Sequence, residues 1–223
     1  MQPLVIYKGA FKGRTLQMHS DPSWLHTYAN SRHICSAFHD YLPNTYMQYY
    51  LLGDEVVESS NPNHTRANEV MEGREKRIFD AVADYRAGKE VDLTKFFGGV
   101  HGEFIVDVAM SLAFDLRKRY LVMVENRGAI ENLPDDAMVE IPAYITDRGA
   151  EPVRVGEIPT FYKGLIEQQE AVEKLVVEAA IEHSYEKALM AFTLSKTVPS
   201  LLVAKKILDD MIEANKEFWP ELH

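Results

Sequence analysis

The sequence lacks the features that mark several large classes of protein. Cysteine occurs once in 223 residues, at Cys35, so no disulfide can form within the chain and a reducing, cytoplasmic location is expected. We interpret Cys35 as a small buried or half-buried thiol. No apolar run approaches the ~20 residues of a membrane span, and the first residues do not form a signal peptide.

Positive charge is also scarce. The chain has 24 Lys and Arg against 34 Asp and Glu, a net charge of −10. This balance disfavours nucleic acid and anionic membrane surfaces as partners. A small anion can still bind an acidic chain, because one or two Arg side chains and a helix N-terminus are enough to hold it.

Two further absences concern cofactors. No Gly-x-Gly-x-x-Gly motif follows a strand-like run, so the sequence contains no recognisable dinucleotide site. His64 and His101 are isolated and form no pair at metal-ligand spacing on one helix. We therefore expect neither a cofactor site nor a metal site within this chain.

The composition, 46% hydrophobic and 26% charged, is typical of a folded domain. Residues 1–20 stand apart, because they hold no acidic residue and are interrupted by Gly9 and Gly13. We interpret this segment as a poorly specified leader. Beyond it, helical periodicity dominates, and four side chains after the leader fall on one predicted helix face: Leu42, Tyr46, Tyr49 and Tyr50.

A long helix is predicted to begin between Asn63 and Arg66 and to run to Tyr85. Asn63 or Thr65 is its expected cap, since Pro62 cannot extend it backwards. Apolar periodicity predicts another helix over residues 103–118 and helices throughout the last third of the chain.

Three short β-rich runs lie between these helices, at residues 120–124, 138–141 and 152–155, the last two joined through a turn at 147–149. The sequence therefore predicts an α+β fold that is mostly helical and contains a small antiparallel sheet.

Three polar segments are candidates for chemistry. Tyr46 lies closest to the Pro-Asn-Thr loop that precedes the aromatic helix, although aromatic residues at helical spacing more often form a core. Arg66 enters a helix N-terminus, where it binds an anion or pairs with Glu69 or Glu72 on the surface. Asn126 follows a strand and precedes Gly128, at a cleft edge or a simple turn that needs positive φ.

The chain resembles the C-terminal half of the family 4 glycoside hydrolases, and within that family it is most similar to the 6-phospho-α-glucosidases, which act on maltose 6-phosphate. The resemblance covers residues 21–223 and leaves 1–20 unmatched. Seven runs carry it: LPNTYMQYYLL, SNPNHTRANEVMEGRE, VMVENRGAIENLPDDAMVEIPAYI, EPVRVGEIP, KGLIEQQEAVEKL, LSKTVPS and EANKEFWPEL.

The resemblance implies a fold like the C-terminal domain of lactate and malate dehydrogenases. It also implies hydrolysis of 6-phosphoglucosides by a route that depends on NAD and on Mn²⁺. In the family, NAD⁺ oxidises the sugar at C3, a tyrosine takes the C2 proton, and the bond at C1 then breaks by elimination. Tyr46 falls on the position of that base and Arg66 on the substrate-binding arginine, whereas Asn126 is a weaker candidate without an assigned role.

The resemblance further implies that an N-terminal half is absent from this sequence. That half holds the NAD loop, the metal ligands and the acid, and Cys35 lies in the wrong segment to replace a ligand. We expect the chain alone to be inactive. Its expected partners are a phosphorylated disaccharide, a separate NAD-binding half, and further copies of itself in a homo-oligomer. The alternative is a non-catalytic remnant or interaction protein that self-associates through the apolar face normally packed on the NAD domain.

Overall fold

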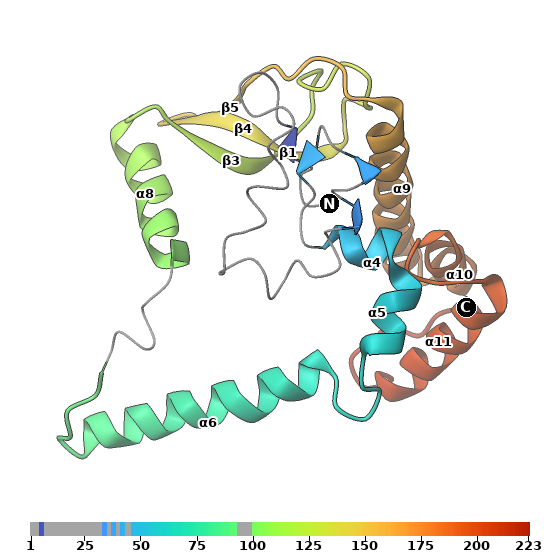
Figure 1. The fold of residues 1–223 in the computed structure, drawn as a ribbon, viewed down its shortest axis with the longest axis horizontal. Coiled ribbons are helices and arrows are strands. Elements are labelled where there is room, and N and C mark those ends of the chain that lie inside the picture. Colours follow the sequence, from blue (N-terminus) through green and yellow to red (C-terminus); the bar gives the residue numbers. More distant parts are fainter. Residues whose placement is uncertain (1–4, 7–32, 35–36, 39–40, 43–45, 93–99) are drawn as a thin grey trace. The chain divides into compact units, whose positions relative to one another are not determined.

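The structure is a computed structural model that describes residues 5–6, 33–34, 37–38, 41–42, 46–92 and 100–223 (Figure 1). These residues are mostly helical and include a small antiparallel sheet, which confirms the predicted α+β class. The helices are α4 (Met47–Leu51), α5 (Gly53–Ser59), α6 (Arg66–Arg86), α8 (Val100–Phe114), α9 (Thr160–Glu182), α10 (Tyr185–Leu194) and α11 (Leu201–Ala214). The strands are β1 (Val5–Ile6), β2 (Tyr41–Leu42), β3 (Lys118–Glu125), β4 (Met138–Thr146) and β5 (Gly149–Pro152).

The chain divides into two compact units, and each is described by itself. The first unit comprises Met1–Gly53, Leu121–Ala143 and Pro152–His223, and the second comprises Asp54–Tyr120 and Tyr144–Glu151. The three-stranded sheet has the order β3-β4-β5, with β4 in the centre.

The first unit has a core on its part of the sheet. Buried aliphatic side chains from β3, β4, the loop between them and the segment before α9 form this core, and Ile166 of α9 packs against it. Its buried members are Val124, Ala129, Ile130, Leu133, Ala137, Val139, Ile141 and Ile158. Alternate residues of β4 are buried, as expected for a strand with one face on a core.

A second core in this unit joins α9, α10 and α11, which lie together in Figure 1. Ala179, Ala188 and Leu208 are buried at its centre, where the small alanine side chains allow the helices to approach closely. The Ser184 and Ser200 hydroxyls cap α10 and α11 by accepting from backbone N–H groups in the first turn.

The second unit contains α6 and α8. The structure confirms the long predicted helix, which begins at Arg66 with Thr65 as its N-cap. Helix α8 is covered less completely: among its described side chains, residues 102–114, Ser111 alone is buried.

Three predicted boundaries are wrong for local reasons. Leu42 does not share a helix face with the tyrosines, because it lies in β2 and pairs with Val5 of β1. The helix predicted over 103–118 begins at Val100 and ends at Phe114, since Asp115 and Arg117 adopt positive φ and turn the chain into β3.

The third strand was predicted at 152–155 but spans 149–152. Its shift follows from a tight turn: the Thr146 hydroxyl donates to the Gly149 carbonyl at 3.1 Å and accepts from the Arg148 N–H at 3.2 Å. Gly149 has φ of 110°, so pairing resumes immediately after the turn.

Candidate functional site

Tyr46 is the N-cap residue of α4 and directly precedes Met47. Met47, the next residue, is buried and fixes the short helix on the first unit. Consecutive helical positions point about 100° apart, so Tyr46 is directed elsewhere and is 52% exposed. Its ring lies 6.0 Å from that of Tyr49, centroid to centroid. The phenol therefore lies on the surface rather than in a core.

Helix α4 is supported by α9. Met47 and Tyr50 line a crevice together with Leu165, Gln168, Gln169 and Lys196. The Gln168 amide donates to the Leu194 carbonyl at 2.8 Å, which ties α9 to the end of α10. Tyr46 therefore precedes a short helix, α4, whose side chains lie against α9.

Arg66 is the first residue of α6, as the sequence predicts. Asn68 organises the entry to this helix, because its side-chain oxygen accepts from the Thr65 N–H at 2.9 Å and from the Thr65 hydroxyl at 2.8 Å. His64 lies 3.1 Å from the carboxylate of Glu72. These contacts fix the loop that presents Arg66.

The Arg66 guanidinium is 79% exposed and pairs with Glu69 at 2.7 Å. The sequence allowed two interpretations of Arg66, an anion site or a surface ion pair with Glu69 or Glu72. The structure contains the ion pair with Glu69. An exposed ion pair of this kind contributes only about 0–1 kcal/mol, so a multiply charged anion can displace the carboxylate. Tyr46 belongs to the first unit and Arg66 to the second, so each is placed only in its own surroundings.

Asn126 is a structural residue. Its side chain is fully buried, donates to the carbonyls of Ile130, Leu133 and Pro134 at 2.9–3.1 Å, and accepts from the Ile130 N–H at 2.7 Å. Every polar atom of the amide is therefore engaged in shaping the loop after β3. Gly128 has φ of 77°, as the predicted turn requires.

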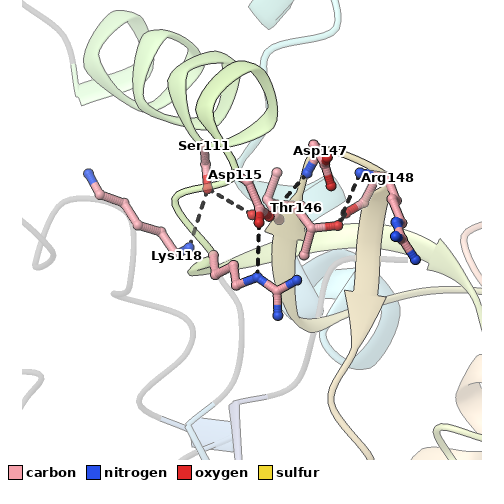
Figure 2. A network of polar contacts seen from close by, with 9 residues as sticks. Ser111, Asp115, Lys118, Thr146, Asp147 and Arg148 are labelled. Atoms are coloured by element: carbon pink, nitrogen blue, oxygen red, sulfur yellow. Dashed lines mark hydrogen bonds and ion pairs between the residues drawn. The ribbon is translucent and has the colours of Figure 1, made fainter.

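A polar network that the sequence did not reveal joins α8 to the sheet within the second unit (Figure 2). The Ser111 hydroxyl donates to the Ile145 carbonyl at 2.9 Å and accepts from the Lys118 N–H at 3.3 Å. The Asp115 carboxylate accepts from the Asp147 N–H at 3.3 Å. These residues meet only in the folded chain. Their hydrogen bonds attach α8 and the turn that follows it to the sheet.

A second attachment of α8 lies one turn earlier. Asp107 accepts from Lys118 at 2.5 Å and from the Tyr120 hydroxyl at 2.7 Å. These two donors hold the pKa of Asp107 below its ordinary value, with the lysine contributing most. Burial, reinforced by the hydrogen bond to Asp107, raises the pKa of Tyr120, so this phenol keeps its proton and remains the donor to Asp107.

No cluster of three His, Cys, Asp or Glu side chains that could hold a metal occurs among the described residues. Cys35 and the side chain of His101 lie outside what the structure describes. None of the helices in the described part of the chain combines the length and apolar composition needed to cross a bilayer.

Comparisons with known proteins identify a family and several relatives of this chain. Residues 6–198 match the model of the family 4 glycosyl hydrolase C-terminal domain. The chain is 50% identical over 202 residues to the maltose-6′-phosphate glucosidase of Bacillus subtilis, covering 91% of this chain and 45% of that protein. The family match begins inside the segment that the sequence sets apart as a leader, and a boundary near residue 20 stays a prediction.

Two solved structures are also similar. A 6-phospho-α-glucosidase from gut microorganisms, in complex with NAD and glucose-6-phosphate, is 65% identical with a TM-score of 0.86, covering 93% of this chain and 47% of that chain. A second one, in complex with NAD and Mn²⁺, is 43% identical with a TM-score of 0.82, covering 92% and 46%. The chain thus spans about half the length of the relatives it matches, and the predicted family fold is confirmed.

Proposed function

The chain belongs to the family 4 glycosyl hydrolases, whose C-terminal domain it carries, and from this we propose that it forms the substrate-side half of a glycosidase. The proposed reaction is hydrolysis of the O-glycosyl bond of 6-phosphoglucosides such as maltose 6-phosphate. The observation that carries the proposal is the 65% identity, over 93% of the chain, to a 6-phospho-α-glucosidase. Preference for the α-linkage follows the same likeness.

We propose Tyr46 as the base that takes a proton from a carbon of the sugar ring. Its phenol is half-exposed at the start of a helix that a buried neighbour holds in place, so a substrate can approach it. A tyrosine has an ordinary pKa near 10, so it is an adequate base only for a C–H that the rest of the site has made acidic. Tyr46 therefore acts only in the assembled enzyme.

Arg66 is proposed to bind the phosphorylated sugar. A guanidinium recognises phosphate or neighbouring hydroxyl groups through several parallel hydrogen bonds, and Arg66 lies at a helix N-terminus, where an anion is favoured. The weak exposed pair with Glu69 leaves this group available for exchange with substrate.

The described residues do not fit NAD or Mn²⁺, since they include neither a metal cluster nor a glycine-rich nucleotide loop. We place the groups that bind both cofactors in the half of the enzyme that lies outside this sequence. The remaining partners that we propose are a separate NAD-binding half and further copies in a homo-oligomer, working in the cytoplasm.

The test combines this chain with the N-terminal half of the gut 6-phospho-α-glucosidase, NAD⁺ and Mn²⁺, and follows release of 4-nitrophenol from its 6-phospho-α-glucoside. Tyr46→Phe is expected to lower kcat at least about 100-fold. The matched variant Tyr49→Phe, one turn along the same helix, is expected to retain most activity. Similar activity of the wild type and Tyr46→Phe contradicts the assignment of the base.

The same assay tests Arg66. Arg66→Ala is expected to raise KM about tenfold or more, while Arg86→Ala, at the opposite end of α6, leaves KM unchanged. An unchanged KM for Arg66→Ala rules out its role in substrate binding. Absence of hydrolysis in a verified complex of the two halves favours the non-catalytic interaction protein instead.

A further inference from the structure

Helix α8 is apolar on nearly every side, although most of it is exposed in this chain. It contains only two charged residues, Glu103 and Asp107, and Asp107 is already bound by Lys118 and Tyr120. Six large apolar side chains of the helix are 42–66% exposed: Phe104, Ile105, Val106, Met110, Leu112 and Phe114. A helix that is apolar all round is typically an interior helix.

The exposed side chains occupy two separate faces of α8. Ile105 and Leu112 are seven residues apart and share one face, whereas Val106, Met110 and Phe114 follow at intervals of four on another. Ser111 is turned to the sheet, where its hydroxyl binds the Ile145 carbonyl. The sheet therefore covers one side, and the apolar faces on either side of it have no cover among the described residues of the second unit.

The exposed apolar area of α8 is a large part of what one partner contributes to a stable interface. With about 150 Å² for each fully exposed side chain, the lower end of the range for large side chains, the exposed parts of these six amount to roughly 500 Å². Each partner in a stable protein complex contributes about 800 Å². Contact with a partner over α8 alone thus supplies most of one side of such an interface.

We propose that α8 is the docking surface for the half of the enzyme that the relatives carry outside the matched region. This chain spans 47% of a relative that is 65% identical to it, so about as many residues again belong to the whole enzyme. That number is sufficient for a complete domain. The occupant is a domain surface with apolar side chains and few charges, since the exposed faces of α8 offer almost no polar partner.

This inference rests on the proposed function only in assuming that the chain works within a family 4 enzyme. A second copy of the chain is the competing occupant. A homo-oligomer contact forms between surfaces that the folded subunit can expose, whereas α8 carries apolar residues on more than one face. A helix that needs partners on several of its faces is characteristic of packing between two parts of one folded enzyme.

Thiol labelling tests the docking directly. The only cysteine is replaced with Cys35→Ser, and Ile105→Cys or Phe114→Cys is added, with Glu213→Cys on exposed α11 as the control. Labelling is timed with and without a saturating amount of the N-terminal half of the gut 6-phospho-α-glucosidase. We expect both α8 positions to react at least about tenfold more slowly in its presence, and the control to change less than about twofold.

A substitution gives an independent measure. Ile105→Asp places a carboxylate on the docking face and is expected to weaken association of the two halves at least about tenfold. Leu202→Asp, at an equally exposed position on α11, is expected to leave it unchanged. Circular dichroism of the free chain verifies that both variants are folded.

Two results overturn the proposal: equal labelling of α8 with and without the other half, or protection that rises with the concentration of this chain alone. The second result assigns α8 to a second copy. Repeating the labelling with Tyr46→Phe separates this inference from the proposed function, because docking is expected to survive the loss of catalysis. In the assembly with the wild-type chain, protection without hydrolysis overturns the function alone, and hydrolysis without protection overturns the docking alone.

Discussion

The two units of the chain use apolar side chains in opposite ways. In the first unit, β3, β4 and α9 to α11 enclose two cores whose central members, such as Leu208, are fully buried. In the second, α8 and α6 leave large apolar side chains such as Ile105 and Phe79 mostly exposed. The described part of the first unit thus contains two internal cores, whereas α8 of the second unit exposes most of its large apolar side chains.

This difference indicates where substitutions will act. Removing a buried group in the first unit costs folding free energy, because its contacts lie within the chain. Removing an exposed apolar group of α8 costs association, because its contacts lie in another part of the enzyme. The following variants test that distinction, from the largest expected effect to the smallest.

Asn126→Ala is expected to have the largest effect on stability. The substitution removes the bonds of the amide to three carbonyl groups and one N–H inside the first unit, and we expect it to lower the free energy of unfolding by about 3 kcal/mol or more. Denaturant unfolding measures the change. Asn132→Ala, which removes two hydrogen bonds to Ile158, should cost roughly half as much, and a cost for Asn126→Ala below that of Asn132→Ala contradicts this view of the loop.

A matched pair of leucines compares the two units. Leu208 is fully buried in α11, and Leu112 is 47% exposed in α8. Leu208→Ala is expected to destabilise the chain by about 3 kcal/mol, whereas Leu112→Ala changes stability by less than about 1 kcal/mol and weakens binding of the other half. Equal destabilisation by both would show that α8 is already part of a core.

The sequence predicted elements whose signals are local. Helix α6 was predicted because Pro62 and a cap at Asn63 or Thr65 mark its start, and the structure places the cap at Thr65. The turn at Gly128 followed from the conformational freedom of glycine. Both features depend on a few neighbouring residues.

Features that depend on distant partners were missed. Pairing of Leu42 with Val5 joins segments that are far apart in the chain, and helical spacing gave no sign of it. Asn126 was a candidate site residue because the sequence does not show that its amide binds four backbone groups. Ser111 showed no signal at all, because its role depends on the carbonyl of Ile145. The roles of Tyr46 and Arg66 came from the family resemblance rather than from the pattern of residues.

Glu69→Gln is expected to have the smallest effect. It removes the charge that pairs with Arg66, and an exposed pair is worth at most about 1 kcal/mol, so the apparent affinity for the phosphorylated substrate should rise about two- to threefold. Measuring KM in the assembly of the two halves checks this. Weaker binding would indicate that Glu69 positions Arg66 rather than competing for it.

The most direct test of the account is the fate of the sugar proton that Tyr46 is proposed to remove. Hydrolysis by the two-half assembly in D₂O should yield glucose 6-phosphate carrying deuterium at C2, because the phenol exchanges its proton with solvent before returning it. NMR of the product measures this, and Tyr46→Phe should abolish incorporation. Product formed in D₂O without carbon-bound deuterium would contradict the claim that this chain supplies a base to a glycosidase.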